Sequence, residues 1–150
     1  MRRKDRELEK EEMMELLMRG EYGILSTIGE NGYPYGVPVN YVFIDNAIYF
    51  HCAVEGQKLD NIMNNDKVSF CVIGETRVLP EQFSTKYESV IIFGKANEIY
   101  DDEKNIALLE ILNKYSKEYL EKGKQYIKNA DAKVKVLKIN IEYISGKARK

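Results

Sequence analysis

Residues 34–59 read PYGVPVNYVFIDNAIYFHCAVEGQKL. Two stretches rich in β-branched and aromatic residues, 34–44 and 47–52, flank the dipeptide Asp-Asn at 45–46, and a turn this short joins antiparallel strands. A glycine then precedes segment 57–65, whose apolar residues have helical spacing. This part of the chain therefore predicts two antiparallel strands followed by a short helix.

The same patterns continue on both sides of this stretch. Further strands are predicted at 22–28, 67–73, 87–100 and 134–144, and further helices at 5–19 and at 101–122, with Asp101 as the cap of the latter. The polar segment 74–86 is predicted to be a loop. A change of phase between Val136 and Leu137 indicates a bulge. Six mostly antiparallel strands with flanking helices predict a mainly β, α+β fold: a small barrel or curled sheet.

Length and composition narrow the class of protein. A chain of 150 residues is the size of one domain, so residues 1–150 are expected to fold as a single unit. The formal net charge of −1 gives no sign of nucleic-acid binding. No apolar run is long enough to span a membrane, and the charged N-terminus does not resemble a secretion signal. With two cysteines only, a cytoplasmic protein with reduced thiols is expected.

The only histidine, His51, stands next to Cys52 on a predicted strand. Adjacent strand residues face opposite sides of a sheet, and zinc needs three or four ligands, so no metal site is expected here. Cys52 and Cys71 are interpreted as small apolar residues of the wall. His51 shares its side with Tyr49 and Ala53; it is either a histidine held in place by hydrogen bonds or a group that positions a ligand or carries a proton.

Gly56, Gln57 and Lys58 occur where the strand gives way to the helix. Backbone N–H groups at a helix start attract phosphate, and the lysine can add a positive charge. The Walker pattern is absent. The alternative is an ordinary surface turn with a solvated lysine.

Three segments, YPYGVPVNYV, YFHCAVEGQKLDNI and YESVIIFGKANEIY, follow one another at the spacing seen in the pyridoxamine 5′-phosphate oxidase-like flavin-binding proteins. The form FHCA-x-x-GxK resembles in particular the nitroimidazole-resistance branch. The resemblance extends from Arg2 to about Asp102. It implies a six-stranded antiparallel split β-barrel with flanking helices. It also implies a homodimer that holds FMN at its interface.

The resemblance also implies a set of FMN-binding residues. These are Pro38, Val39, Asn40 and Tyr41 along the flavin ring; His51, Cys52 and Ala53 beside the ring and ribityl chain; Gly56, Gln57 and Lys58 at the phosphate; and Ser89 and Val90 reaching in from the partner subunit. The implied activity is an FMN-dependent oxidoreductase that reduces a small molecule such as a nitro compound. His51 would be its catalytic residue, as proton donor or substrate anchor.

Two departures and one alternative accompany this resemblance. No histidine follows His51, which argues against synthesis of pyridoxal phosphate. Gly56-Gln57 replaces the Ser-Arg frequent in those enzymes, so FMN is expected to be held less tightly. Because heme-binding and deazaflavin-binding relatives share the barrel, the alternative is a non-catalytic flavin- or heme-binding module.

Overall fold

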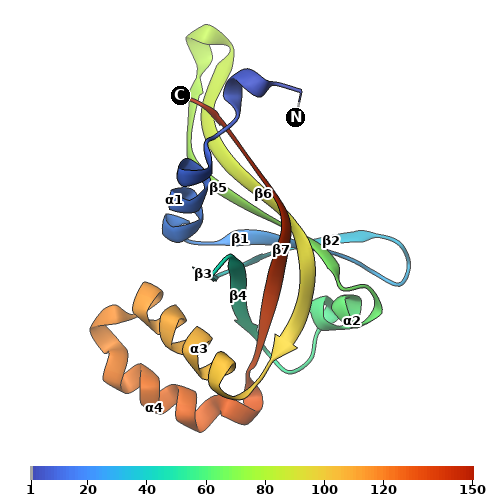
Figure 1. Ribbon diagram of the computed structural model, residues 1–150, viewed down its shortest axis with the longest axis vertical. Coiled ribbons are helices and arrows are strands. Elements are labelled where there is room, and N and C mark those ends of the chain that lie inside the picture. The colour runs from blue at the N-terminus through green and yellow to red at the C-terminus, as the bar shows by residue number, and fades with distance from the viewer. Residues whose placement is uncertain (1) are drawn as a thin grey trace.

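The computed structural model describes residues 2–150 (Figure 1). Its strands are β1 Gly23–Ile28, β2 Pro34–Val39, β3 Val42–Ile44, β4 Ala47–Cys52, β5 Lys67–Leu79, β6 Ser84–Ile99 and β7 Lys135–Arg149. Its helices are α1 Lys10–Arg19, α2 Gln57–Asn64, α3 Asp101–Tyr115 and α4 Leu120–Ala130. All strand pairs are antiparallel, in the order β2-β1-β5-β6-β7-β4-β3. Within residues 2–150, no helix has the length and apolar character needed to cross a membrane.

The sheet is curled, because its two edge strands are consecutive in the chain. β2 and β3 lie at opposite ends of the strand order, yet only Asn40 and Tyr41 separate them. Three Cα-to-Cα steps of about 3.8 Å must therefore connect one edge to the other. The mainly β fold with flanking helices is confirmed. The sheet has seven strands rather than six, because segment 34–44 is interrupted at this dipeptide, and it is not closed.

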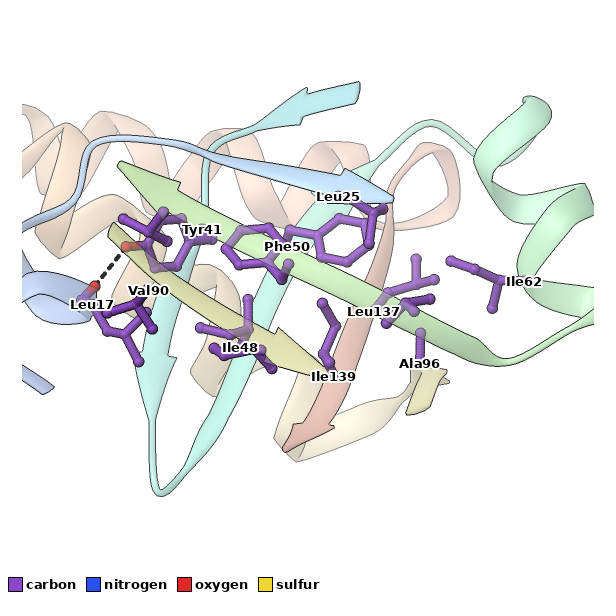
Figure 2. Packing of buried hydrophobic residues seen from close by; sticks show 14 of the residues in the cluster. Leu17, Leu25, Tyr41, Ile48, Phe50, Ile62, Val90, Ala96, Leu137 and Ile139 are labelled. Carbon is purple, nitrogen blue, oxygen red and sulfur yellow. Dashed lines mark hydrogen bonds between the residues drawn. The ribbon is translucent and has the colours of Figure 1, made fainter. Parts of the chain in front are cut away.

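Two hydrophobic clusters lie on opposite faces of β4 and β7. The larger one fills the inside of the curl, where Phe50 and Leu137 are buried (Figure 2). There the hydroxyl of Tyr41 donates a hydrogen bond of 2.7 Å to the carbonyl of Leu17 in α1. The smaller cluster lies under α3 and includes Val136. Most of β4 and the first residues of β7 are therefore covered on both faces.

Burial on both faces explains why the expected bulge between Val136 and Leu137 is wrong. The two residues are buried in different clusters, and they pair regularly with His51 and Phe50. Val136 and Leu137 are both apolar because β7 is covered on both faces here, and not because a bulge shifts the alternation of its side chains. The irregularity of β7 lies instead near Glu142, where the pairing with β6 shifts between Phe93 and Gly94.

The expected loop at 74–86 is also wrong. β5 and β6 continue through most of it as a hairpin, which turns at Pro80–Gln82 and pairs Leu79 with Ser84. Together with the end of β7, the hairpin projects beyond the rest of the sheet (Figure 1). Most of its residues are exposed on both faces, so its sequence carries the polar composition typical of a loop.

The helix boundaries differ from the expected ones in physically clear ways. α1 begins at Lys10 rather than at residue 5. Glu9 and Glu12 form a reciprocal capping box at this start. The helix expected over 101–122 ends at Tyr115, and α4 follows after a short turn. Asp101 is not the cap: it has φ 52° and lies inside the helix after Tyr100. The Asp-Asn turn at 45–46 is confirmed, with positive φ at both residues.

Candidate functional site

Three segments that are distant in sequence meet in one cleft at the split in the sheet. They are the end of β2 with the bridge to β3, the end of β4, and the first turn of α2. The cleft has a volume of about 260 Å³ and is lined by Val37, Pro38, Val39, Asn40, His51, Cys52, Ala53 and Lys58. Most of the residues that the sequence singled out are therefore neighbours in space. We call this the β2–β4 cleft.

His51 and Cys52 face opposite sides of β4, as their adjacency requires. Cys52 packs against the large core, and burial raises the pKa of its thiol. His51 lies on the other side of the strand and is exposed to solvent, and both residues line the cleft. The protein around it lowers the pKa of His51 by desolvation from the ordinary 6.5. The imidazole is therefore neutral at pH 7.

The start of α2 combines the features that attract an anion. Gly56 precedes the helix with φ 139°, a backbone conformation that other residues rarely adopt. The amides of Leu59 and Asp60 donate to the carbonyl of Gly56, which leaves the amides of Gln57 and Lys58 at the helix start available to a ligand. Lys58 is half-buried, and its positive charge acts on the thiol of Cys52 to lower that pKa against the larger effect of burial. Its ammonium group therefore lies on the cleft side of the helix, whereas Asp60 of the same turn is exposed.

The dipeptide that bridges β2 and β3 is held by side chains of α3. The hydroxyl of Tyr115 lies 3.0 Å from the amide nitrogen of Tyr41, 2.8 Å from its carbonyl oxygen and 2.7 Å from the carbonyl oxygen of Glu21. The side-chain amide of Asn40 also donates to the carbonyl of Glu21, at 2.9 Å. A backbone segment without a strand partner thus finds its hydrogen bonds in side chains.

Lys114, in the last turn of α3, also holds the bridging dipeptide in place. Its Nζ donates to the carbonyl oxygens of Gly20 at 2.6 Å and Tyr41 at 3.0 Å, and it lies 4.0 Å from the centre of the Tyr41 ring. Burial lowers the pKa of Lys114 to about 8. The sequence placed Lys114 and Tyr115 in the helix expected over 101–122 and gave neither a role in the site. No motif marks either of them, because their partners are backbone atoms far along the chain.

The other residues implied by the resemblance do not line the β2–β4 cleft. Gly56 and Gln57 lie at the helix start beside it, and the ring of Tyr41 is buried in the large core. Val90 is fully buried in that core as well. Ser89, its neighbour on β6, lies on the other face of the sheet, next to Ile73 of β5.

A second cavity adjoins the first between α3, α4 and the sheet. It has a volume of about 440 Å³, and apolar and aromatic side chains dominate its lining, among them Leu108, Ile111, Tyr115, Tyr126, Ile127 and Val134. Asn40 and His51 line both cavities. Among residues 2–150, no group of three or more His, Cys, Asp or Glu side chains is placed to hold a metal ion.

Several solved structures have the same fold. A candidate 5-nitroimidazole antibiotic resistance protein from Bacteroides thetaiotaomicron matches with a TM-score of 0.77 at 23% identity, over 95% of this chain and 86% of that one. An FAD-binding protein from Mesorhizobium loti matches with a TM-score of 0.68 at 22% identity, over 97% and 98%. An FAD- and heme-binding protein from Mycobacterium smegmatis matches with a TM-score of 0.74 at 17% identity, over 95% and 72%.

Sequence comparison defines the family. Among curated proteins, none matches the sequence of this chain. The sequence profile described as pyridoxamine 5′-phosphate oxidase, in contrast, matches residues 9–148, which include every strand and helix from α1 to the last residues of β7. The chain therefore belongs to the pyridoxamine 5′-phosphate oxidase family.

Proposed function

We propose that this protein binds FMN in the β2–β4 cleft and is an oxidoreductase that reduces a small organic molecule. The observation that carries the proposal is the convergence of three separate segments on one cleft, with a glycine–lysine helix start at its edge. A flavin requires the same combination: a flat wall for its ring and a positive, N–H-rich end for its phosphate.

The residues of the cleft fit the two ends of FMN differently. The free amide groups at the start of α2 and the ammonium of Lys58 would hold the phosphate through charge-assisted hydrogen bonds. The ends of β2 and β4 would supply the wall along the ring and the ribityl chain. When bound, the flavin supplies the electron-transfer chemistry, and the protein orients and tunes it.

His51 is the side chain best placed to act on a substrate. It borders the cleft on the face away from the large core, and desolvation lowers its pKa, so it is neutral at pH 7. A neutral imidazole carries one N–H donor and one acceptor nitrogen. We therefore propose that His51 anchors the substrate by donating a hydrogen bond to its polar group.

Two of the structural relatives support the cofactor and the substrate class. The Mesorhizobium loti protein binds FAD, which contains the same ring system as FMN. The Bacteroides protein is a candidate resistance factor against 5-nitroimidazoles, so a nitro compound is a reasonable substrate to test, and we place this chain in the nitroimidazole-resistance branch as a proposal.

We further propose a homodimer in which the second chain completes the flavin site. A volume of 260 Å³ is below the usual range of roughly 300–1,000 Å³ for small-molecule sites, so one chain supplies only part of a flavin site. The outer sheet face carries Ile91 and Phe93, which are 41% and 50% exposed, and Phe93 stacks on Tyr143. A twofold contact through this face would bury them and would bring Ser89 to the partner's cleft.

The decisive experiment is the absorption spectrum of the protein purified without added cofactor, followed by titration with FMN and with riboflavin. The proposal predicts a flavin spectrum, or uptake of about one FMN per chain, and tighter binding of FMN than of riboflavin because the phosphate adds charge-assisted bonds. Equal affinity for the two compounds would contradict the phosphate assignment.

A second candidate function is a non-catalytic flavin- or heme-binding module. The specific observation in its favour is His51, since a neutral, partly exposed imidazole is the form that binds iron. The Mycobacterium smegmatis relative binds both FAD and heme. An intense heme absorption band that is lost in His51→Ala, or a bound flavin that is reduced but never reoxidised by a nitro compound, would favour this alternative.

A further inference from the structure

The cavity between α3 and α4, here called the α3–α4 cleft, is not explained by flavin binding. Its volume of about 440 Å³ falls within the usual range for small-molecule sites, roughly 300–1,000 Å³. The two helices lie side by side below the sheet (Figure 1). No residue of α4 is fully buried, so this helix covers the cleft without completing a packed core.

The α3–α4 cleft opens onto the proposed flavin site. Asn40 and His51 line both cavities, so these two side chains form a shared wall. The backbone next to this wall is fixed by Tyr115, whose ring lines the α3–α4 cleft while its hydroxyl holds Tyr41. A molecule in this cleft would therefore lie against the residue that we propose to anchor the substrate.

The charges around the α3–α4 cleft argue against a charged ligand. Lys122 and Asp131 are the only ionisable groups of its lining apart from tyrosines and His51. Both are exposed, and the carboxylate of Asp131 is paired with Lys104 at 2.9 Å. His51 is neutral at pH 7. An anion would find only the solvated Lys122 as an opposite charge here, and a cation would find only Asp131, which is already paired. Neither would recover the hydration that it loses among the apolar side chains.

The aromatic lining points to an aromatic ligand. Tyr119 and Tyr126 are 64% and 70% exposed, although both line a mostly apolar cavity. Rings of this kind gain from covering by another ring, in stacked or edge-to-face contact. Asn40 and His51 add polar groups to this lining at the wall that it shares with the β2–β4 cleft.

We infer that the α3–α4 cleft is the substrate pocket, and that it selects a small, uncharged aromatic compound. The aromatic ring lies among the side chains of α3 and α4, and its polar substituent points to Asn40 and His51. The inference rests on the proposed function in one respect only, that the bound compound is the substrate; the binding itself does not require flavin.

The test uses nitrobenzene as an uncharged probe and 4-nitrobenzoate as its charged counterpart. His51 is the only histidine, so its ring protons give an assigned NMR signal at the wall of the cleft. Nitrobenzene should shift this signal in protein free of flavin, and 4-nitrobenzoate should bind at least about tenfold more weakly, a difference that corresponds to about 1.4 kcal/mol. Equal binding of the two compounds would overturn the inference.

A pair of matched variants locates the binding. Ala130 lines the cleft and Ala132 does not, so Ala130→Phe fills the cavity while Ala132→Phe adds the same ring outside it. Nitrobenzene should bind about tenfold or more weakly to Ala130→Phe and unchanged to Ala132→Phe. Unchanged binding by both variants would place the probe elsewhere.

A third variant covers the case in which Ala130→Phe does not fold. Ile127→Ala enlarges the cleft, so it should raise the affinity for 1-nitronaphthalene relative to that for nitrobenzene; an unchanged ratio would overturn the inference. Flavin content separates the two proposals. A protein that never takes up flavin but binds nitrobenzene in this cleft refutes the proposed oxidoreductase and retains the pocket. A flavin-loaded protein whose nitrobenzene binding is the same in all three variants refutes the pocket and retains the proposed oxidoreductase.

Discussion

The hydroxyl of Tyr115 lies within 3.0 Å of both the amide nitrogen and the carbonyl oxygen of Tyr41. The hydroxyl accepts a hydrogen bond from this N–H, and its own proton is donated to one of the two nearby carbonyls, of Tyr41 or Glu21. Tyr41 belongs to the dipeptide that connects the two edges of the sheet, where no strand partner is available. One side chain of α3 thus fixes the dipeptide Asn40-Tyr41, here called the joint of the curled sheet. Through this joint it also fixes the wall of the proposed site.

The first prediction concerns this joint. Tyr115→Phe removes the hydroxyl and leaves the amide N–H of Tyr41 without its partner, while the carbonyls of Tyr41 and Glu21 still accept from Lys114 and Asn40. We expect the free energy of unfolding to fall by about 1–3 kcal/mol, the usual cost of an unsatisfied buried group. Urea denaturation measures it as a lower midpoint at an unchanged slope. Tyr119→Phe, at a ring that is 64% exposed, serves as control and should change stability by less than about 0.5 kcal/mol. Equal stability of the two variants would contradict the assigned role.

The second prediction concerns Lys114, which holds the same joint. Its pKa is about 8 in the folded protein, against 10.5 ordinarily, because burial disfavours the charged form. Between these two pH values the unfolded chain binds more protons than the folded one. This lysine therefore makes the free energy of unfolding rise with pH from about 8 to 10.5. Lys114→Gln cannot titrate and should lack this contribution. Denaturation of both proteins across this range checks it: a constant difference in stability between them would show that the lysine is not desolvated.

The strands and the candidate site could largely be predicted from the sequence, because their signals are local. The tight turn at Asp45 and Asn46, and the glycine before α2, are recognised from a few adjacent residues in the sequence. Strand parity alone placed His51 and Cys52 on opposite faces. The convergence of the end of β2, the end of β4 and Lys58 in one cleft is what the family resemblance implied.

The errors arose where burial or pairing is decided at long range. Whether β7 is covered on one face or on two depends on α3, so Val136 and Leu137 could not be interpreted from β7 alone. The polar hairpin of β5 and β6 is stabilised by backbone pairing that includes β7, which its side chains do not reveal. The break between β2 and β3 likewise depends on Tyr115, far along the chain.

The third prediction concerns the phosphate end of the β2–β4 cleft. Lys58→Ala should remove one charge-assisted contact, worth on the order of 1.5–3 kcal/mol, and weaken FMN binding roughly tenfold or more. Riboflavin, which has no phosphate, should bind the variant as well as it binds the parent. The control is Lys67→Ala, an exposed lysine at the start of β5. Titration with both flavins measures the effect; undiminished FMN affinity in Lys58→Ala would mean that other groups hold the phosphate.

The fourth prediction concerns assembly. Phe93 is 50% exposed and stacks on Tyr143 on the sheet face that we propose to meet the partner subunit. Phe93→Glu would bury a charge in that contact, so it should convert a dimer into a monomer and release the flavin at the same time. Tyr126→Glu places the same charge on α4, at a ring 70% exposed, and should leave the dimer intact. Sedimentation velocity at micromolar concentration distinguishes these outcomes. A parent protein that is already monomeric would refute the shared site.

The last prediction concerns His51, which lines both cavities. As the only histidine, it gives a single imidazole titration by NMR, which we expect below 6.5 because burial lowers its pKa. If the ring anchors the substrate by donating a hydrogen bond, the rate at which a nitroaromatic compound reoxidises the chemically reduced protein should follow the titration of His51. It should rise as the ring is protonated, because an imidazolium donates a stronger, charge-assisted hydrogen bond. His51→Ala should retain FMN and the dimer but react about 10²–10³-fold more slowly, the usual scale for the loss of one hydrogen-bond donor to the reacting group.

A conservative variant separates this role of His51 from a structural one. His51→Gln keeps an N–H donor but cannot titrate, so it should recover part of the rate and lose the rise in rate at low pH. The folded-state pKa lies below that of the unfolded chain, so protonation also destabilises the fold as pH falls below 6.5, and Gln removes this effect as well. Melting temperature and flavin content, measured on the same samples, show whether a slower rate reflects unfolding. A flavin-loaded, well-folded His51→Ala protein that reacts at the parent rate would exclude His51 from the chemistry and leave it as part of the wall between the two clefts.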